Sequence, residues 1–229
     1  MNYYKLNHSL DKNEIGSQFP QIQKMTKGYN YDSPNSVHSL SRYLFKFPDF
    51  EPDLNSFVLH RSAKLTDLLS AAVISACGLL ISEKLMNLFI KFTIVPMRLY
   101  EASVIEKNKT ERRYYWMHIA GYNFSEKVDY SNSTFSVDNF GTKLEDIKVE
   151  SLSDLLKKEN YMREKYKTRF IKIKGDRIIL DYSVSKYSLF SINGFDFDYY
   201  ISEELRDAIF ANSCTGINLS SAPLSFSDL

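Results

Sequence analysis

The chain has 229 residues, a length that fits one sheet-rich domain or two small domains packed together. Hydrophobic residues make up 44% of it and charged residues 25%, which excludes an intrinsically disordered chain. With 29 basic and 28 acidic residues the net charge is +1, so a general attraction of the whole molecule to nucleic acid or anionic membranes is excluded. We expect a single domain over residues 1–229, with two packed lobes of about 1–145 and 146–229 as the alternative.

The N-terminus and the cysteines indicate the cellular compartment in which we expect the protein. No apolar segment follows the first residues as it does in a secretion signal, and no stretch reaches the roughly 18 apolar residues of a membrane span. Cys77 and Cys214 are far apart in the sequence and belong to no CxxC or Cys/His cluster. We interpret them as small, buried, reduced side chains, and we expect a cytoplasmic protein without a membrane segment.

The aromatic content, with sixteen Tyr and sixteen Phe, favours strands over long helices. In the first half of the chain, Thr66 and Asp67 have the character of an N-cap and a first-turn acid, which predicts a short helix that ends before Gly78. A second helix is predicted after Ser82 and Glu83, where apolar residues recur with a helical period. Strands are predicted at 3–6, 42–47, 57–60, 79–81, 93–105 and 113–120, the last two as neighbours across the loop 106–111.

The second half of the chain begins with a polar stretch at 121–139 that is rich in aromatic residues, which we interpret as a loop region with short strands. A charged helix from Ser151 to about Tyr166 follows, and its i,i+4 pairs of opposite charge indicate a surface helix. Two hairpins are predicted after it, because Gly-Asp and Asn-Gly pairs separate apolar runs. They would pair 169–173 with 177–182 and 187–192 with 195–201.

A strand-to-helix pattern of the form SE-x-L occurs twice, as Ser82 to Leu85 and as Ser202 to Leu205. In each copy an apolar strand precedes the serine, a good N-cap residue, and the glutamate complements the helix N-terminus. The second of these helices is expected to end before Gly216. The predicted fold class is therefore α+β, with mixed, largely antiparallel sheets and a few short helices.

No motif of a catalytic, cofactor-binding or metal-binding centre occurs in the sequence. It contains no GxGxxG, GxxxxGK[ST], HExxH or GxSxG motif. His118 lies within an aromatic strand, where a hydrogen-bonded core imidazole is the simpler interpretation. We therefore predict no enzyme, no cofactor and no metal. The alternative left open is an active site assembled from scattered residues such as Asp196, Asp198 and His118.

The segment 157–177 carries a local positive charge, with nine Lys and Arg residues against three acids. Tyr161, Tyr166 and Phe170 are interleaved with these charges. This combination suits a phosphate backbone with base stacking, so nucleic-acid binding by this segment is the alternative function. A salt-bridged helix followed by a hairpin with outward lysines would give the same composition.

Three groups of motifs carry a family resemblance. They read LHRSAKLTDLLS; GLLISEKLMNLFIKF with the following strands TIVPMRLYEA and YYWMHI; and SLF, YYISEELRDAIF and TGINL. From about Tyr3 to Ala222 the chain thereby resembles a family of immunity proteins from bacterial polymorphic toxin systems, formerly a domain-of-unknown-function family. The resemblance implies a cytoplasmic antidote that binds a cognate protein toxin and holds it inactive, without catalysis of its own. The matching residues, among them Ile201-Ser202-Glu203, Leu205 and Thr215-Gly216, are implied to be scaffold.

The partner-binding surface is expected in the polar loop region, which lies outside those motifs. Its candidate contact residues are Tyr122, Phe124, Tyr130 and Phe135. Exposed aromatic side chains in irregular polar sequence are typical anchors of protein interfaces. The sequence leaves open the alternative that these rings pack beneath their own loop.

Overall fold

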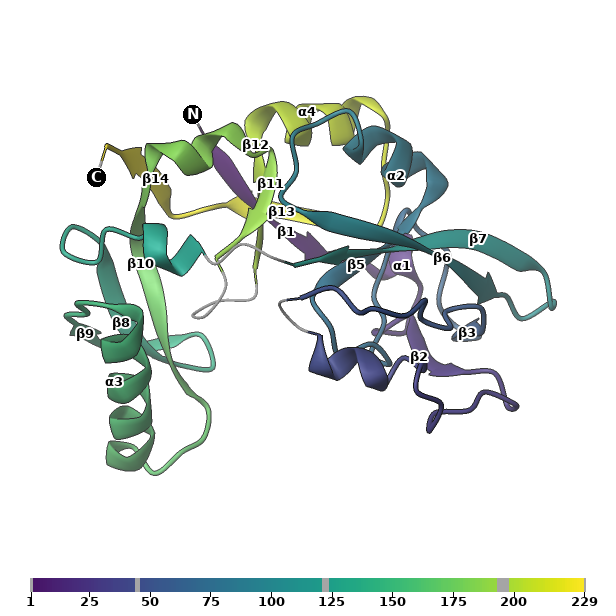
Figure 1. Cartoon of the computed structure of the whole chain (residues 1–229), viewed down its shortest axis with the longest axis horizontal. Helices are drawn as coiled ribbons and strands as arrows, with labels where there is room; N and C mark the ends of the chain where they lie inside the picture. Colours follow the sequence, from purple (N-terminus) through teal and green to yellow (C-terminus); the bar gives the residue numbers. More distant parts are fainter. Residues whose placement is uncertain (1, 44–45, 121–123, 193–197, 229) are drawn as a thin grey trace. The chain divides into compact units, whose positions relative to one another are not determined.

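The structure, a computed structural model, describes residues 2–43, 46–120, 124–192 and 198–228 (Figure 1). The chain forms two compact units. Unit 1 contains Met1–Lys5, Asn123–Glu203 and Ser220–Leu229, and unit 2 contains Leu6–Tyr122 and Glu204–Leu219. Residues that are far apart in the sequence therefore share one compact unit.

Strands predominate over helices, and the predicted α+β class with mixed, largely antiparallel sheets is confirmed. The helices are α1 (Lys12–Ile15), α2 (Glu83–Phe89), α3 (Leu152–Lys165) and α4 (Glu203–Ala211), with 3-10 turns η1 (Ser39–Arg42), η2 (Phe124–Lys127) and η3 (Tyr182–Lys186). The strands are β1 (Tyr3–His8), β2 (Ile22–Met25), β3 (Phe57–Leu59), β4 (Leu68–Leu69), β5 (Gly78–Ser82), β6 (Met97–Ile105), β7 (Glu111–Ile119), β8 (Thr134–Asn139), β9 (Thr142–Ile147), β10 (Ile171–Asp181), β11 (Leu189–Ser191), β12 (Tyr199–Ser202), β13 (Ile217–Ser221) and β14 (Leu224–Ser227).

Unit 2 is built on a six-stranded sheet in the order β2-β3-β6-β7-β5-β4. Strands β6 and β7 pair along their whole length, with Met97 opposite Ile119 at one end, so the predicted neighbours across the loop 106–111 are confirmed. The pair β3–β6 is parallel, whereas the other neighbours are antiparallel. A parallel bridge between Ile22 and Ala71 joins the two ends of the sheet.

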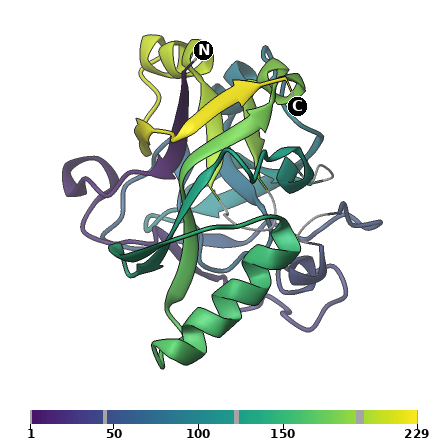
Figure 2. The same cartoon turned by 90° about the vertical axis from the view of Figure 1, so that its left-hand side faces the viewer.

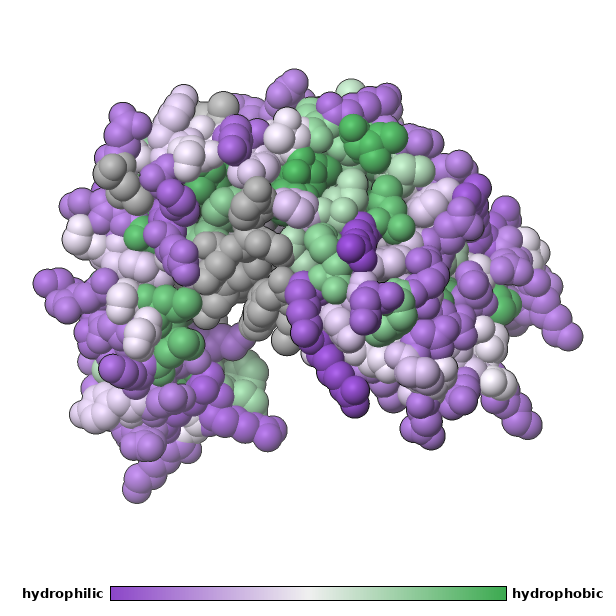
Figure 3. All heavy atoms as spheres, in the orientation of Figure 1, coloured by the Kyte–Doolittle hydropathy of each residue, from purple (hydrophilic) through white to green (hydrophobic). Residues whose placement is uncertain are grey.

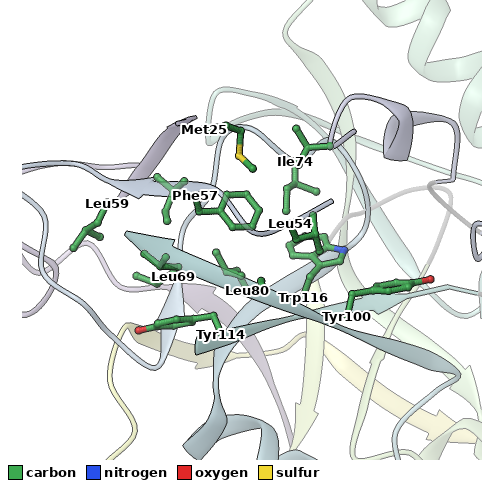
Figure 4. Packing of buried hydrophobic residues seen from close by; sticks show 14 of the residues in the cluster. Met25, Leu54, Phe57, Leu59, Leu69, Ile74, Leu80, Tyr100, Tyr114 and Trp116 are labelled. Atoms are coloured by element: carbon green, nitrogen blue, oxygen red, sulfur yellow. The ribbon is translucent and has the colours of Figure 1, made fainter. Parts of the chain in front are cut away.

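A hydrophobic core cluster of unit 2 lies on one face of this sheet (Figure 4). Phe57, Leu80 and Trp116 come from three different strands and are at most 4% exposed. Full burial of side chains of this size contributes about 1.5–3 kcal/mol each relative to exposure. Tyr114 belongs to the same cluster, and its hydroxyl donates a hydrogen bond of 2.8 Å to the backbone oxygen of Thr66. The aromatic strands predicted from composition thus build the core of unit 2.

Unit 1 holds the four-stranded sheet β14-β10-β8-β9, in which β10 pairs in parallel with β14 and antiparallel with β8. Alternate residues of β10, Ile171 and Ile173, are buried on the side of α3, which runs beside the strand (Figure 2). Met162 of α3 and Val137 of β8 pack with Ile171 in a small cluster. A third sheet has the order β11-β12-β1-β13, and the boundary between the units falls within β1 and within β13.

The predicted cap of α2 at Ser82 and the predicted start of α3 at Ser151 are confirmed. The Ser82 hydroxyl accepts a hydrogen bond from the Leu85 amide over 3.2 Å, and the Ser151 hydroxyl accepts one from the Asp154 amide over 3.1 Å. Each SE-x-L copy begins a helix directly after a strand, α2 after β5 and α4 after β12. Each of the two serines, Ser82 and Ser151, therefore satisfies one backbone amide in the first turn of its helix, where amides have no intrahelical partner.

The helix predicted after Thr66 is wrong. Leu68 and Leu69 form the short strand β4, because they pair with Ile81 and Leu80 of β5. Pairing with a distant strand outweighs the local capping signal of Thr66 and the following acid. The strand predicted at 42–47 also fails at its start, since Arg42 ends the turn η1, while residues 44–45 lie outside the described ranges.

The hairpin predicted around Gly175-Asp176 is wrong as well, because Ile171–Asp181 is one continuous strand. Its first half pairs with β8 and its second half with β14, and a register shift between Gly175 and Arg177 marks a bulge where a turn was predicted. For the second predicted hairpin, β11 and β12 do pair in antiparallel fashion. Its Asn193-Gly194 turn lies outside the described residues.

Two further expectations concern the membrane and the cysteines. In the described part of the chain, no helix is both long and apolar enough to cross a membrane. Cys77 and Cys214 are free thiols, but each is half-buried where a buried side chain was expected. Partial burial still raises the pKa of both thiols above its ordinary value.

Candidate partner-binding surface

The aromatic residues predicted as contact points are less exposed than expected. Phe124 is 7% exposed and Phe135 only 2%, so the expected exposure is wrong for both. The Phe124 ring packs 5.7 Å from that of Phe190, and the Phe135 ring stacks 5.9 Å from that of Tyr130. Tyr130 is half-buried, and burial raises the pKa of its hydroxyl to about 12. Tyr122 lies outside the described residues.

The reason for this difference is that the stretch is structured. Phe124 lies in the turn η2, and Phe135 lies in β8, whose neighbours β9 and β10 bury it. The alternative that these rings pack beneath their own segment therefore describes Phe124 and Phe135. Whether the region contacts a partner stays a prediction, and the exposed aromatic residues of unit 1 are found elsewhere.

A different set of aromatic side chains is exposed in unit 1, and the face of this unit seen in Figure 3 is mostly hydrophilic. Phe140 is 75% exposed, Phe170 43% and Tyr166 36%. The rings of Phe140 and Phe170 lie 4.2 Å apart between centroids. The Tyr166 hydroxyl donates a hydrogen bond of 2.8 Å to Oε1 of Glu145, which connects the end of α3 to the hairpin β8–β9. We name the following group the aromatic tip: Phe140, Tyr166 and Phe170 with Lys165, Lys167 and Arg169.

Phe140 stands in the two-residue turn between β8 and β9. Asn139 lies opposite Thr142, and the φ angles of Phe140 and Gly141 are 51° and 84°, both positive as in a type I′ turn. Glycine adopts this conformation freely, whereas a residue with a Cβ atom does so at a cost of about 1–2 kcal/mol. An exposed aromatic ring on a strained residue does not favour folding. Such positions are often functional.

The helix α3 ends at the aromatic tip in a Schellman arrangement. The amide of Thr168 donates to the oxygen of Arg163 over 3.1 Å, and the amide of Lys167 donates to that of Glu164 over 3.2 Å. Lys167 has a φ of 50° and occupies the left-handed position where glycine is usual. Of the four non-glycine residues with positive φ in the described ranges, Phe140 and Lys167 thus both belong to the tip.

Positive charges lie over the rings of the tip. The Arg169 guanidinium is 5.1 Å from the Phe170 ring centroid, and Lys165 Nζ is 5.0 Å from that of Tyr166, both within the range of cation–π attraction. Hydrogen bonds from Lys165 and Tyr166 hold the pKa of Glu145 below its usual value. The other two cations of the tip make no ion pair with any described residue, so the surface around the rings is positive.

The wider basic segment 157–177 is only partly neutralised. Three of its nine basic residues pair with acids: Lys158 with Asp154, Arg163 with Glu159 and Lys165 with Glu145. The other six form no ion pair within the described ranges: Lys157, Lys167, Arg169, Lys172, Lys174 and Arg177.

Four residues of the motifs behind the family resemblance meet in unit 2, around the carboxylate of Asp67, which is 9% exposed. Its carboxylate accepts hydrogen bonds from Ser82 Oγ at 2.7 Å, from the Thr215 amide at 2.8 Å and from Lys84 Nζ at 2.9 Å. Burial raises the pKa of this carboxyl group, but the bonds from Lys84, Ser82 and Thr215 outweigh burial, and the pKa lies below its usual value. We name Asp67, Ser82, Lys84 and Thr215 the Asp67 hub.

Gly216 adjoins the Asp67 hub and fits only as glycine. Its φ is +80°, and a Cβ atom there would lie 2.2 Å from the backbone oxygen of Leu68 and 2.5 Å from Oγ1 of Thr66. Its amide donates a hydrogen bond of 2.7 Å to Oε1 of Glu14. The hub and Gly216 explain the LTD, SEKL and TG motifs as parts of one interlocked scaffold.

The residues considered for a scattered active site make separate contacts. His118 is fully buried, its Nε2 lies 2.8 Å from the backbone oxygen of Tyr43, and burial lowers its pKa, so the predicted core imidazole is confirmed. Asp198 forms an ion pair with Lys5, and Asp196 lies outside the described residues. In the ranges that the structure describes, no three His, Cys, Asp or Glu residues are grouped as metal ligands.

The sequence matches no model of a known protein family, and no curated protein matches it either. The surfaces of the structure and the motifs of the sequence are the features that bear on function. Those motifs account for the Asp67 hub and leave the aromatic tip unexplained.

The sequence did contain a signal for the tip. Residues 134–138 alternate between polar and apolar side chains, and Gly141 follows soon after this run, as is typical of a strand that ends in a turn. The loop region predicted at 121–139 ends one residue before Phe140, so the prediction does not include the turn that exposes this ring.

Proposed function

We propose that this protein is an immunity protein that binds a cognate bacterial toxin domain in the cytoplasm and holds it inactive. The centre of the contact is the aromatic tip of unit 1. The resemblance of the motifs supplies the class of partner, and the tip supplies the binding surface. The inhibition is by occlusion, and the protein contributes no chemical step.

One observation carries this proposal: Phe140 is 75% exposed although its positive φ disfavours an aromatic residue. Aromatic and arginine side chains dominate the energetics of protein interfaces. The contact of Phe140 with Phe170, and the attachment of Tyr166 to Glu145, hold the rings in place before a partner arrives. A pre-ordered surface loses less conformational entropy on binding, which favours tight association.

The charge of the tip indicates the chemistry of the partner surface. Arg169 and Lys167 have no acid partner among the described residues, and Lys165 shares Glu145 with Tyr166. The complementary toxin surface is an apolar pocket with an acidic rim. Such complementarity raises the association rate, and salt lowers it.

The proposal is tested with the C-terminal domain of the protein encoded by the neighbouring gene, expressed alone and together with this chain. We expect the domain to stop bacterial growth alone, and growth to return when this chain is co-expressed. In a binding assay, Phe140→Ala and Phe170→Ala should weaken the complex at least about 30-fold, as expected for anchors worth about 2 kcal/mol each.

Phe210→Ala is the matched control, because Phe210 is 64% exposed but lies in unit 2. It should leave the affinity unchanged. If Phe210→Ala weakens the complex while Phe140→Ala does not, the aromatic tip is not the contact surface. If the neighbouring domain neither stops growth nor binds, the antidote function itself is wrong.

Nucleic-acid binding by the segment 157–177 is the second candidate, favoured by its six cations without acid partners in the described ranges. Lys172 and Lys174 stand on the exposed side of β10. Fluorescence anisotropy with single-stranded RNA and DNA tests this function. It requires binding that falls steeply with salt and weakens in Lys172→Gln/Lys174→Gln. Absence of binding at low salt removes it.

A further inference from the structure

A cleft of about 500 Å³ opens in unit 2 beside the strands β2 and β3. Its basic lining residues are Lys24, Arg61 and Lys107, and His60 adds an imidazole. The remaining lining residues are Gln23, Val58 and Leu59. No acid lines the cleft, and its volume is within the usual range of small-molecule sites, about 300–1,000 Å³.

The backbone fixes the places of the three cations. Lys24 is opposite Val58 in the β2–β3 register, and Val58 is opposite Ile105, two residues before Lys107. Arg61 lies in a turn that is closed by a hydrogen bond of 2.9 Å from the Ala63 amide to the oxygen of the preceding histidine. The positive charges therefore come together through the fold of three separate segments.

No acid neutralises these cations within the described ranges. Lys24, Arg61 and Lys107 form no ion pair there, although Glu106 is the sequence neighbour of Lys107. The carboxylate of Glu106 is already engaged, since it accepts a hydrogen bond of 2.7 Å from Nε of Arg112. Three like charges around one cleft repel each other, and a bound anion would remove that repulsion.

His60 adds a hydrogen-bond donor to the cleft. Its Nδ1 accepts a hydrogen bond of 3.2 Å from the Ser62 amide. The neutral imidazole therefore carries its proton on Nε2, which is free to donate to an anionic oxygen. The Gln23 side chain adds an amide whose Nε2 donates one hydrogen bond of 3.4 Å to the Pro20 oxygen and carries a second N–H.

From this lining we infer that the cleft binds a small molecule that carries several phosphate groups. Three cations match a polyphosphate better than a single carboxylate, and the Val58 side chain offers apolar contact to the rest of the ligand. The lining contains no Phe, Tyr or Trp, and the single imidazole of His60 does not provide the row of rings on which successive bases of single-stranded nucleic acid stack. The cleft belongs to unit 2, whereas the aromatic tip belongs to unit 1, and the two sites share no residue.

Inorganic tripolyphosphate is the probe for this site, titrated by calorimetry at low ionic strength, where phosphate contacts are strongest. We expect one bound equivalent. Inorganic monophosphate should bind at least about tenfold more weakly, because it meets fewer of the cations. The amide signals that shift in NMR spectra should include those of Gln23, Val58 and Arg61.

Two double variants with the same change in net charge decide the outcome. Lys24→Gln/Lys107→Gln should weaken tripolyphosphate binding at least about tenfold, whereas Lys12→Gln/Lys91→Gln, at exposed positions outside the cleft, should not. All four lysines are exposed, so both variants should keep the wild-type circular dichroism spectrum and urea midpoint.

The inference is overturned if tripolyphosphate does not bind, or if both double variants weaken it equally, which would mean diffuse attraction by surface charge. It is also overturned if single-stranded RNA binds through the cleft while tripolyphosphate does not. None of these results depends on whether the neighbouring toxin domain binds the aromatic tip.

Discussion

The Asp67 hub and the aromatic tip differ in whether their polar groups are paired and in whether their positive-φ positions are occupied by glycine. At the hub, a nearly buried carboxylate is surrounded by donors, and the adjacent left-handed position is taken by Gly216, which adopts it without strain. At the tip, Phe140 and Lys167 adopt left-handed conformations as non-glycine residues, and their side chains face solvent. The hub is arranged for stability, whereas the tip gives up stability at two positions.

This contrast separates scaffold from function within the chain. The hub takes its four residues from the LTD, SEKL and TG motifs, and Ser82, Lys84 and Thr215 each contact Asp67. The residues of the tip lie outside those motifs and gain nothing for the fold from their exposure. Strain at an exposed site is explained when another molecule supplies the compensating contact. The partner of such a protein is therefore expected to be set by residues that the motifs do not contain.

The largest expected effect is that of Gly216→Ala. The new Cβ would meet the backbone oxygen of Leu68 at 2.2 Å, and the φ of +80° adds strain. We expect a loss of about 3 kcal/mol or more in the free energy of unfolding, measured by urea denaturation. The hub would have to move to relieve the contact.

Gly141→Ala is the matched comparison, because Gly141 has a φ of +84° but no atom within 4 Å of the added Cβ. It should cost only the backbone strain, about 1 kcal/mol. Equal losses for the two variants would mean that crowding at the hub contributes nothing, and the contrast between hub and tip would fail.

Asp67→Asn should have the next largest effect on stability. The amide cannot accept from Ser82, Lys84 and Thr215 together, so we expect a loss of about 2 kcal/mol at neutral pH. Because the folded-state pKa of Asp67 is below its ordinary value, the ionised carboxylate stabilises the fold above the unfolded pKa of about 4. That stability is lost as the pH falls through the folded pKa.

The difference between wild type and Asp67→Asn should therefore shrink in urea denaturation as the pH is lowered from 7 toward 3. Glu51→Gln is the control, since Glu51 is exposed. It should leave both the stability and its pH dependence unchanged. A difference for Asp67→Asn that is the same at both pH values would show that the carboxylate charge is not what holds the hub.

An element of this fold is predictable from the sequence when the residues that pair with it or cap it are close to it in the sequence. The caps at Ser82 and Ser151 and the neighbours β6 and β7 were predicted because their partners lie within a few residues or one loop. The hairpin around Gly175-Asp176 was not, because β8 and β14, which hold that segment straight, lie before α3 and near the end of the chain.

The candidate site was harder to predict than the fold for the same reason. Phe124 and Phe135 read as exposed aromatic residues of a loop, but Phe190 and the strand β10 come from later in the chain to cover them. Phe140, five residues after Phe135, is exposed because it falls in the turn. Aromatic composition alone does not distinguish these two fates, whereas the glycine that directly follows Phe140 indicates a turn.

Phe140→Asn should change stability little and binding greatly. Asn-Gly is the preferred pair for a type I′ turn, so relief of about 1–2 kcal/mol of strain offsets the loss of an aromatic pair worth about 0.5–1.5 kcal/mol. We expect a urea midpoint equal to or slightly above that of the wild type, together with weaker binding to the proposed toxin partner. A clear loss of stability would mean that the ring belongs to the fold.

The smallest expected effect is that of Lys167→Gly, and it tests whether strain at the tip serves the partner. Lys167 and Ser213 occupy equivalent left-handed positions after α3 and α4, each with the Schellman pair of hydrogen bonds. Glycine at either position should raise the free energy of unfolding by about 0.5–1 kcal/mol. Only Lys167→Gly should also lower partner affinity, because only that cation belongs to the tip. If both variants gain stability and neither affects binding, the strain at Lys167 is unrelated to the partner, and Phe140 alone must account for the contact.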